Sequence, residues 1–274
     1  MTENISILNT ALPDIVELQD VTQTYDDGKV KVIDKLSLLI EDKPNQGQFV
    51  ILLGPSGCGK STVLRYIAGI QKPTIGKVFI KGKERTDKDT IGMVFQQYSS
   101  FPWLTVLENV ALGLKLKGIS KNARKEQAME MIRIVGLEGH ENKYAQYPSL
   151  SGGQLQRVAI ARSLLVNSEI ILMDEPFGAL DTNTRLKMQD FLLEIWKNVY
   201  PTIVLVTHDI SEAVYLGDDI YIMSNAPANI YEHISINFNQ AKDRNLKRKK
   251  EFVDMVYYIE DKMMQITIPE NTPQ

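Results

Sequence analysis

A glycine-rich loop between an apolar segment and a helical pattern constrains the fold of this chain most. The loop reads Gly-Pro-Ser-Gly-Cys-Gly-Lys-Ser over residues 54–61 and follows the continuous apolar run of residues 49–53. Such a loop between a buried strand and a helix points successive backbone N–H groups at phosphate, and the helix adds the positive end of its dipole. A ligand-free glycine turn is disfavoured, because the spacing is complete and the flanks fit a strand and a helix. The predicted ATP-binding residues of this loop are Gly54, Pro55, Ser56, Gly57, Cys58, Gly59, Lys60, Ser61 and Thr62.

Two acidic residues complete a predicted site for ATP and Mg²⁺. The strand pattern of residues 170–173 delivers Asp174 and Glu175 to its carboxyl end, the edge at which open α/β sheets bind ligands. In such a site Lys60 reaches the β- and γ-phosphates and the Ser61 hydroxyl ligates Mg²⁺. Asp174 is expected to hold the same ion, and Glu175 to polarise the attacking water as general base. Considered alone, the two acids fit a solvent-exposed turn as well as a catalytic site. The complete phosphate loop favours the catalytic site.

One histidine also ends an apolar strand pattern. His208 follows the run of residues 203–206 closely. A lone histidine is more often structural than catalytic. Its place at the carboxyl end of a predicted strand, beside the predicted phosphate site, nevertheless favours a catalytic role. The other histidines, His140 and His233, lie outside any motif and receive no role.

Short apolar segments alternate with helical patterns along most of the chain. Period-two patterns at residues 16–19 and 36–40 predict strands near the N-terminus. From residue 49 onward, strands and helices alternate, which predicts an α/β fold with a mostly parallel core sheet. The pattern is helical between about residues 97 and 155, with Ser120 as a predicted N-cap, so we expect an inserted helical subdomain. The later elements are expected as helices at 155–165 and 186–196 and strands at 170–173, 203–206 and 220–223, the last of these being the final strand.

Composition limits the classes of partner and the compartment. The formal net charge of −3 gives no electrostatic reason to expect nucleic-acid binding. The first residues lack a secretion-signal pattern, and no apolar run approaches the ~20 residues of a membrane-spanning helix. Cys58 is the only cysteine, which excludes an internal disulfide and fits a small spacer. Residues 231–274 are expected to form a helical C-terminal extension, whose basic run fits a solvated helix face better than a lipid-binding surface. We expect a cytosolic protein that reaches a membrane only through partners.

A second glycine motif, Leu-Ser-Gly-Gly-Gln, precedes the helix predicted at 155–165. Together with the phosphate loop it resembles the signature of the ATP-binding cassette (ABC) ATPases, a family that this sequence resembles over nearly its whole length. The resemblance implies an ABC-type P-loop ATPase domain over residues 1–230, with an N-terminal antiparallel β region and the inserted helical subdomain. It also implies that the signature binds the ATP held by a partner subunit. The signature residues are Leu150, Ser151, Gly152, Gly153 and Gln154.

Four further residues match motifs of that family. The resemblance implies that Tyr25 stacks on adenine, although packing at a strand end explains a tyrosine there as well. Gln96 is implied to act in catalysis and to link Mg²⁺ and water to the transport subunit. Asp181, in the Gly-Ala-Leu-Asp segment, is implied to belong to a loop that crosses the dimer interface. His208 is implied to contact the γ-phosphate.

Two segments extend the resemblance to one group of transporters. Residues 101–110 and 175–181 are similar to the ATPase subunits of bacterial importers for nitrate, sulfonates, taurine or bicarbonate, although residues 147–150 are one residue tighter than the usual pattern. The resemblance implies a second ATPase subunit, identical or homologous, a transmembrane permease and an extracytoplasmic solute-binding protein. It places this chain at the cytoplasmic face of the membrane, attached through the permease. An exporter stays open, because the partners set the direction of transport. An ABC ATPase acting on DNA or ribosomes is disfavoured, since the sequence has no coiled-coil insertion or second cassette. A nucleotide kinase has no use for residues 150–154.

Overall fold

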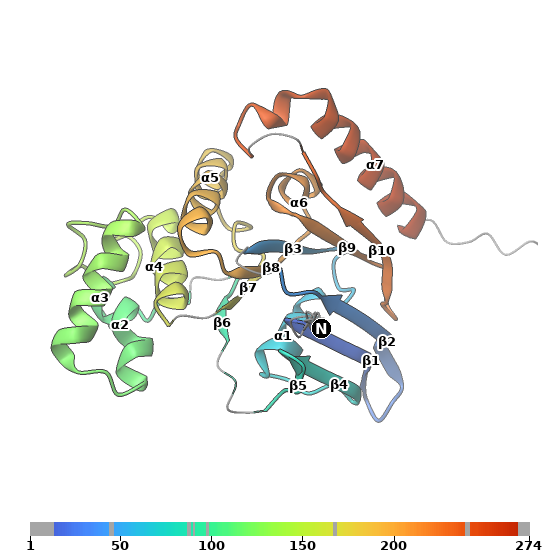
Figure 1. Ribbon diagram of the computed structural model, residues 1–274, viewed down its shortest axis with the longest axis horizontal. Coiled ribbons are helices and arrows are strands. Elements are labelled where there is room, and N and C mark those ends of the chain that lie inside the picture. Colours follow the sequence, from blue (N-terminus) through green and yellow to red (C-terminus); the bar gives the residue numbers. More distant parts are fainter. Residues whose placement is uncertain are drawn as a thin grey trace, which may run out of the picture.

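The computed structural model describes residues 14–43, 47–86, 89, 91–96, 99–166, 169–238 and 242–267. Its strands form two sheets, of which the smaller is antiparallel and the larger is mostly parallel (Figure 1). The smaller sheet has the order β2–β1–β4–β5, with β1 (Val16–Tyr25), β2 (Val30–Ile40), β4 (Ile75–Ile80) and β5 (Lys83–Glu84). The larger sheet has the order β10–β9–β3–β8–β7–β6, with β3 (Gln48–Leu53), β6 (Gly92–Val94), β7 (Ile170–Asp174), β8 (Thr202–Thr207), β9 (Asp219–Met223) and β10 (Ile230–Ser235). The predicted mostly parallel core sheet and N-terminal antiparallel region are confirmed.

The apolar run of β3 is continuous because both faces of this strand are covered. Phe49, Ile51 and Leu53 pack into a core that the larger sheet shares with most of the helices. Val50 and Leu52 point to the opposite face, into a second core shared with α1 (Lys60–Ala68) and the smaller sheet. Figure 1 shows α1 between the two sheets. Alternate residues of β3 thus pack into the two cores that lie on opposite faces of the larger sheet.

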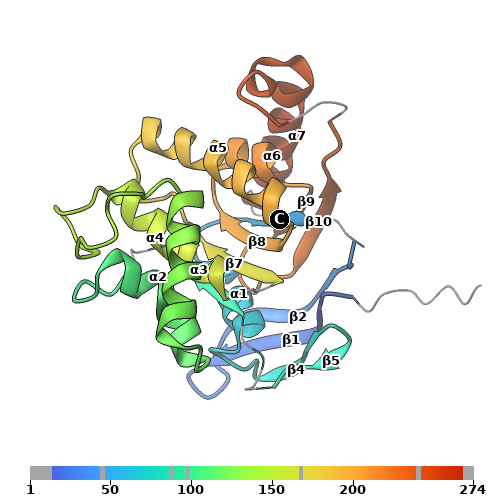
Figure 2. The same cartoon turned by 60° about the vertical axis from the view of Figure 1, so that its left-hand side comes forward.

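Three helices form the inserted region beside β6, at the end of the larger sheet opposite β10 (Figure 2). They are α2 (Val106–Leu116), α3 (Lys121–Ile134) and α4 (Gly152–Leu165), and the later helices are α5 (Thr182–Val199), α6 (Ile210–Leu216), the 3₁₀ turn η1 (Leu246–Arg248) and α7 (Lys250–Thr267). Helices α4 and α5 begin earlier than the apolar pattern predicts, because Ser151 and Asp181 cap their first turns through the side chain. Ser120 does stand at the N-cap of α3, but its side chain makes no capping hydrogen bond.

The C-terminal segment differs from its prediction. Residues 231–235 belong to β10, which pairs antiparallel with β9, so the strand at 219–223 is not the last and the sheet continues past residue 230. The predicted helix lies further on, as α7, where the Tyr258 hydroxyl donates to Glu232 of β10. The basic run is not simply a solvated helix face, because it begins before α7 and Lys242 bonds to Leu216 O and Gly217 O, each at 2.8 Å. The division into an ATPase domain and an extension stays a prediction.

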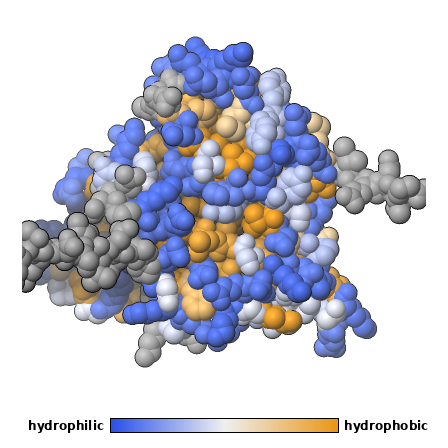
Figure 3. All heavy atoms as spheres, turned by 45° about the vertical axis from the view of Figure 1, so that its right-hand side comes forward, coloured by the Kyte–Doolittle hydropathy of each residue, from blue (hydrophilic) through white to orange (hydrophobic). Residues whose placement is uncertain are grey.

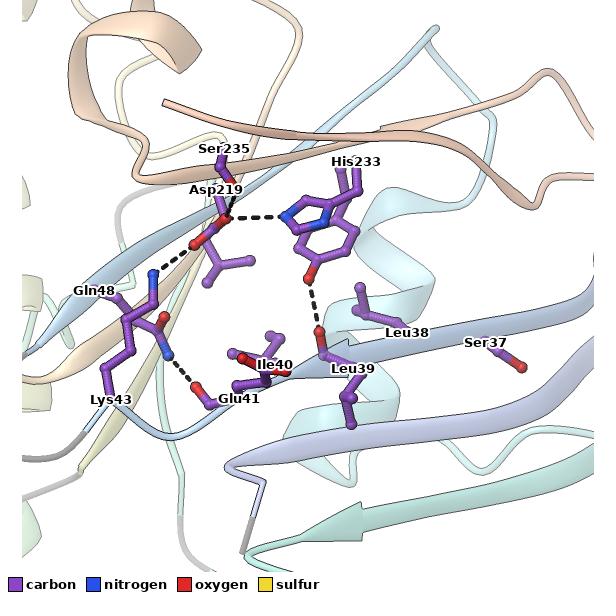
Figure 4. A pocket seen from close by; sticks show the side chains of 12 residues that line it. Ser37, Leu38, Leu39, Ile40, Glu41, Lys43, Gln48, Asp219, His233 and Ser235 are labelled. Atoms are coloured by element: carbon purple, nitrogen blue, oxygen red, sulfur yellow. Dashed lines mark hydrogen bonds and ion pairs between the residues drawn. The ribbon is translucent and has the colours of Figure 1, made fainter. Parts of the chain in front are cut away.

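A cavity of about 400 Å³ lies between β2 and the β9–β10 hairpin (Figure 4). Its polar centre is Asp219, which accepts from Lys43 Nζ at 2.8 Å and from Ser235 Oγ at 2.7 Å. His233 Nε2 lies 2.9 Å from the same carboxylate, and its ring stacks on Tyr221 with 4.2 Å between centroids. Burial raises the pKa of the Asp219 carboxyl, but the bonds from Lys43, Ser235 and His233 outweigh burial and hold the pKa below its usual range. This carboxylate of β9 therefore joins the two strands of the hairpin to each other and to Lys43, which follows β2.

The surface combines polar and apolar side chains. On the face shown in Figure 3, hydrophobic patches near the middle are bordered by hydrophilic side chains. Helix α7 also exposes Val253, Tyr257 and Met264. Within the described ranges, every helix is too short or too polar to cross a membrane.

Candidate active site

The phosphate loop curls around the ammonium group of Lys60. This side chain is buried, and its Nζ donates to the carbonyls of Gly54 and Pro55, each at 2.8 Å. Gly59 has a φ of +106°, in the left-handed region that side chains avoid, and a Cβ there would lie 3.0 Å from Ile33 of β2. The backbone therefore curves tightly at the start of α1. A curled backbone around a lysine at a helix N-terminus fits the phosphate-binding role predicted for it.

The loop is joined to β7 by two oxygen-bearing side chains. Ser61 Oγ donates to Asp174 Oδ1 at 2.8 Å. Burial raises the pKa of the Asp174 carboxyl, the bond from Ser61 opposes this, and the charge of Glu175 adds to it. A hydroxyl and a carboxylate in contact are the hard oxygen ligands that Mg²⁺ prefers, and a dication would favour the ionised acid that burial disfavours. The residues present therefore fit the predicted Mg²⁺.

Three polar side chains meet beyond the ends of neighbouring strands. Gln96 follows β6, and its Nε2 donates to Glu175 Oε2 at 3.1 Å. His208 follows β8, and its Nδ1 lies 3.3 Å from Glu175 Oε1. Glu175 itself has a φ of +45°, and its backbone N–H donates to Val206 O at 3.0 Å. The structure thus brings the three predicted catalytic residues together around one carboxylate, at the edge of the sheet that the sequence indicated.

Exposure separates the roles that these groups can take. The His208 side chain is 59% exposed and the Glu175 side chain only 21%. A carboxylate held between two partners and largely shielded from solvent is suited to receive a proton from a water molecule. The exposed imidazole beside it is accessible to a group arriving from solvent.

Tyr25 and Cys58 lie at the borders of the site. Tyr25 ends β1 with its side chain 43% exposed, and Gln71 Nε2 donates to its hydroxyl at 3.1 Å. This ring is open to a flat ligand, and its contact with adenine stays a prediction. Burial raises the pKa of the Cys58 thiol, and the nearby Lys60 lowers it less. The thiol form is favoured, as a small spacer requires.

The signature residues form the start of α4. Gln154 N donates to Ser151 Oγ at 3.3 Å, and Ser151 N donates to Gln154 Oε1 at 2.9 Å, which is a reciprocal capping box. Gln154 Nε2 also lies 3.0 Å from His140 Nε2, a histidine without a sequence-based role. At Gly153 a Cβ would lie 2.9 Å from Thr184 of α5, so packing also favours glycine there.

In the described part of the chain, the helix that carries the signature and the helix that follows the phosphate loop have different main packing partners. Helix α4 packs against α2, α3, α5 and β6, whereas α1 packs against β4, β7 and β8. Asp181 is likewise engaged within the chain, where it accepts from Asn183 N and Thr184 N, each at 3.1 Å. The predicted action of these residues on a partner's nucleotide is compatible with this separation and stays a prediction.

Sequence reasoning missed a group of buried polar side chains near the end of β8. Thr207, Gln189 and Glu212 are buried polar side chains. Asp209 N donates to Thr207 Oγ1 at 3.0 Å. Polar residues on predicted helices and strand ends are ordinarily solvent-facing, so their types alone gave no signal.

Comparisons with known proteins agree with this geometry. A family model described as "ABC transporter" matches residues 40–178. The nitrate import ATP-binding protein of Synechocystis is 41% identical over 243 residues, which cover 86% of this chain and 89% of that protein. The taurine import ATP-binding protein of Escherichia coli O157:H7 is 39% identical over 246 residues, covering 87% and 94%. A solved structure described as a dimeric post-hydrolysis state of an ATP-binding cassette bound to ADP and phosphate has a TM-score of 0.68 and 36% identity, covering 81% of this chain and 99% of its own.

Proposed function

This chain belongs to the ABC transporter family, and we propose that it is the ATP-hydrolysing subunit of a bacterial importer for a small anion such as nitrate, a sulfonate, taurine or bicarbonate. Membership means that it binds ATP and that its ATPase activity is coupled to transport. The observation that carries the proposal is the meeting of Gln96, Glu175 and His208 beyond the phosphate loop. The similarity to nitrate and taurine import proteins supports import and the solute class.

The site supports hydrolysis by positioning and proton transfer. Lys60 and the loop backbone hold the phosphates, and the Tyr25 ring stacks on adenine. Ser61 and Asp174 would hold Mg²⁺, which neutralises charge on the phosphates when bound. Glu175 orients a water molecule and takes its proton as the water oxygen attacks the γ-phosphorus, so that ADP leaves with the bridging oxygen.

A second ATPase subunit, identical or homologous, completes the site. The N-terminus of α4 presents backbone N–H groups of the signature, and we assign them to the γ-phosphate held by the partner's loop. Asp181 and its loop then lie at the shared interface. The dimeric structure of a similar cassette with ADP and phosphate supports this arrangement.

The permease would meet an aromatic surface formed by Phe101 and Trp103, which follow Gln96 in the sequence. Trp103 is 68% exposed, and its ring lies 5.3 Å from that of Phe101. The backbone of Phe101 is held on both sides by buried Asn109, which accepts from its N–H at 2.8 Å and donates to its C=O at 3.0 Å. An exposed aromatic pair on a fixed base is suited to docking, and it would place the chain at the cytoplasmic face of the membrane.

Purification of the native assembly from membranes tests the proposal. Co-purification of a permease and a solute-binding protein is expected, together with ATP hydrolysis that rises when the correct anion is added to the reconstituted complex. A complex that moves solute outward would replace import by export. Purification without any membrane subunit would favour a non-transport ABC ATPase.

A further inference from the structure

A row of buried polar side chains runs from the C-terminal segment to the loop that carries His208. Thr207, Gln189 and Glu212 are 4%, 2% and 4% exposed. They come from β8, α5 and α6, which are separate elements. Lys247 of η1 reaches the outer end of the row, where its ammonium lies over the Tyr215 ring at 4.1 Å.

The row is linked by hydrogen bonds at every step. Lys247 Nζ donates to Gln189 Oε1 at 2.9 Å, and Gln189 Nε2 donates to Glu212 Oε2 at 3.0 Å. The Thr207 hydroxyl is hydrogen-bonded to the same carboxylate. Thr207 Oγ1 then accepts from Asp209 N at 3.0 Å, across the backbone of His208.

The direction of these bonds is fixed by the chemistry of the two ends. An ammonium group has donors and no acceptor, so Lys247 requires the amide oxygen of Gln189. The amide nitrogen of Gln189 must then face Glu212, which can only accept while it is ionised. The backbone N–H of Asp209 likewise requires a lone pair of Thr207 Oγ1, which leaves the hydroxyl proton for Glu212.

We propose that Lys247, Gln189 and Glu212 form a directional hydrogen-bond relay that positions the His208 backbone, and so the imidazole against Glu175. These are positioning residues, because none of them touches the reacting groups. The effect on turnover rests on the proposed function, whereas the effect on the His208 loop does not.

Charge around Glu212 shows that its burial is costly. Burial raises the pKa of this carboxyl to about 7, and the bonds from Thr207 and Gln189 oppose the rise only in part. Asp209 raises this pKa further, while Arg185 lowers it, and the Arg185 guanidinium lies 3.6 Å from Asp209. An apolar residue would be more stable at such a position, so the acid needs a role other than packing.

Three variants test the direction of the relay. In Glu212→Gln the new amide oxygen accepts from Gln189, so its amide nitrogen faces Thr207 and the hydroxyl proton loses its acceptor. We expect kcat for ATP hydrolysis to fall about tenfold with little change in KM, since the lesion alters positioning rather than ATP contacts. Lys247→Met alone should cost about twofold to threefold, because it frees the Gln189 amide without reversing a bond.

The double variant separates the relay from ordinary packing. With Lys247→Met in place, the Gln189 amide can rotate and present its oxygen to the new amide at 212, which then accepts from Thr207 again. Turnover of the double variant should exceed that of Glu212→Gln alone. Independent structural lesions would instead add, and an additive result would overturn the proposal. Lys262→Met, which removes an α7 lysine paired with Glu232 of β10, is the control and should leave turnover unchanged.

Nuclear magnetic resonance of the ligand-free chain gives a readout that does not need ATPase activity. Hydrogen exchange at Asp209 N–H should quicken in Glu212→Gln and slow again in the double variant, and the His208 ring signals should shift in parallel. Unchanged exchange would overturn the relay. Changed exchange with unchanged turnover would overturn the positioning role. The variants can show the expected exchange pattern while the wild-type chain fails to hydrolyse ATP in its native complex. That result would overturn the proposed function and leave the relay standing.

Discussion

Helices α2 and α4 begin with the same hydrogen-bond arrangement but not with the same charge. In α2, Glu108 N donates to Thr105 Oγ1 at 3.2 Å and Thr105 N donates to Glu108 Oε2 at 2.8 Å. In α4, Ser151 and Gln154 make the matching pair of bonds at 3.3 and 2.9 Å. Both boxes satisfy backbone donors that a helix start leaves open.

The two helices differ in whether their own first turn supplies negative charge to the positive end of the helix dipole. Helix α2 carries its own carboxylate, and the bond from Thr105 N–H, followed by that from its hydroxyl, lowers the pKa of Glu108. Helix α4 has a neutral glutamine in the same place and no acid in its first turn. A start without its own anion is better suited to meet an anion from outside. The same local motif therefore closes one helix and leaves the other available to a phosphate group.

The largest expected effect comes from the carboxylate that α4 of a partner would face across the nucleotide. Glu175→Gln should keep ATP binding but lower turnover by roughly 10²–10⁴-fold, because the amide cannot take the proton of the water. It should also accumulate an ATP-bound dimer, measured by size-exclusion chromatography with and without ATP. Near wild-type turnover would contradict the assignment of the base.

That trapped dimer sharpens the comparison of the two helices. In the Glu175→Gln background, Ser151→Arg should abolish the ATP-bound dimer, because the bulky cation blocks the approach of α4 to the partner's nucleotide. Thr105→Arg is the matched control and should leave the dimer intact. Equal loss in both variants would break the distinction between the helices.

In the otherwise unchanged chain, Ser151→Arg should lower turnover by about 10²–10³-fold, the cost of losing phosphate donors, while ATP still binds at the loop. Cysteines placed at Ser151 and Ser56, in a chain with Cys58 replaced by Ala, should cross-link between chains only when ATP is present. A bond found only within one chain would refute the shared site.

Mixing the Lys60→Ala and Ser151→Arg chains tests the same site by complementation. In a mixed dimer, the intact loop of one chain meets the intact signature of the other. Part of the activity should return if one intact site is enough.

Particular elements show what the sequence could and could not predict. The meeting of Glu175 and His208 followed from strand ends, because carboxyl ends of parallel strands share one edge. Strand β10 was missed because it is an edge strand that buries only Ile234, so it carries a weak apolar pattern. The apolar stripe put the start of α4 at residue 155 rather than at Gly152, since glycine adds nothing to such a stripe. The burial of Glu212 depends on distant segments that pack over α6, which no local pattern reveals.

A smaller effect is expected from trimming the caps alone. Ser151→Ala and Thr105→Ala should each lower the free energy of unfolding by about 1 kcal/mol, measured by urea denaturation, because each loses one N-cap bond. The two variants should differ in turnover, with a loss only in Ser151→Ala. Matching losses of stability together with matching turnover would show that the Ser151 hydroxyl acts as a cap and nothing more.

The smallest expected effect is a difference in acid sensitivity between the two helix starts. The folded-state pKa of Glu108 lies below its unfolded value, so its contribution to stability is fully present above about pH 4.3 and is lost as pH falls through the folded pKa. The box of α4 is formed by Ser151 and Gln154, neither of which is an acid. On acidification from neutral pH toward about pH 3, hydrogen exchange at Glu108 N–H, corrected for the intrinsic pH dependence of exchange, should therefore quicken relative to that at Gln154 N–H. In Glu108→Gln the two helix starts should respond alike, because both boxes are then neutral. A difference that survives this substitution would assign the acid sensitivity to another group and remove charge as the distinction between α2 and α4.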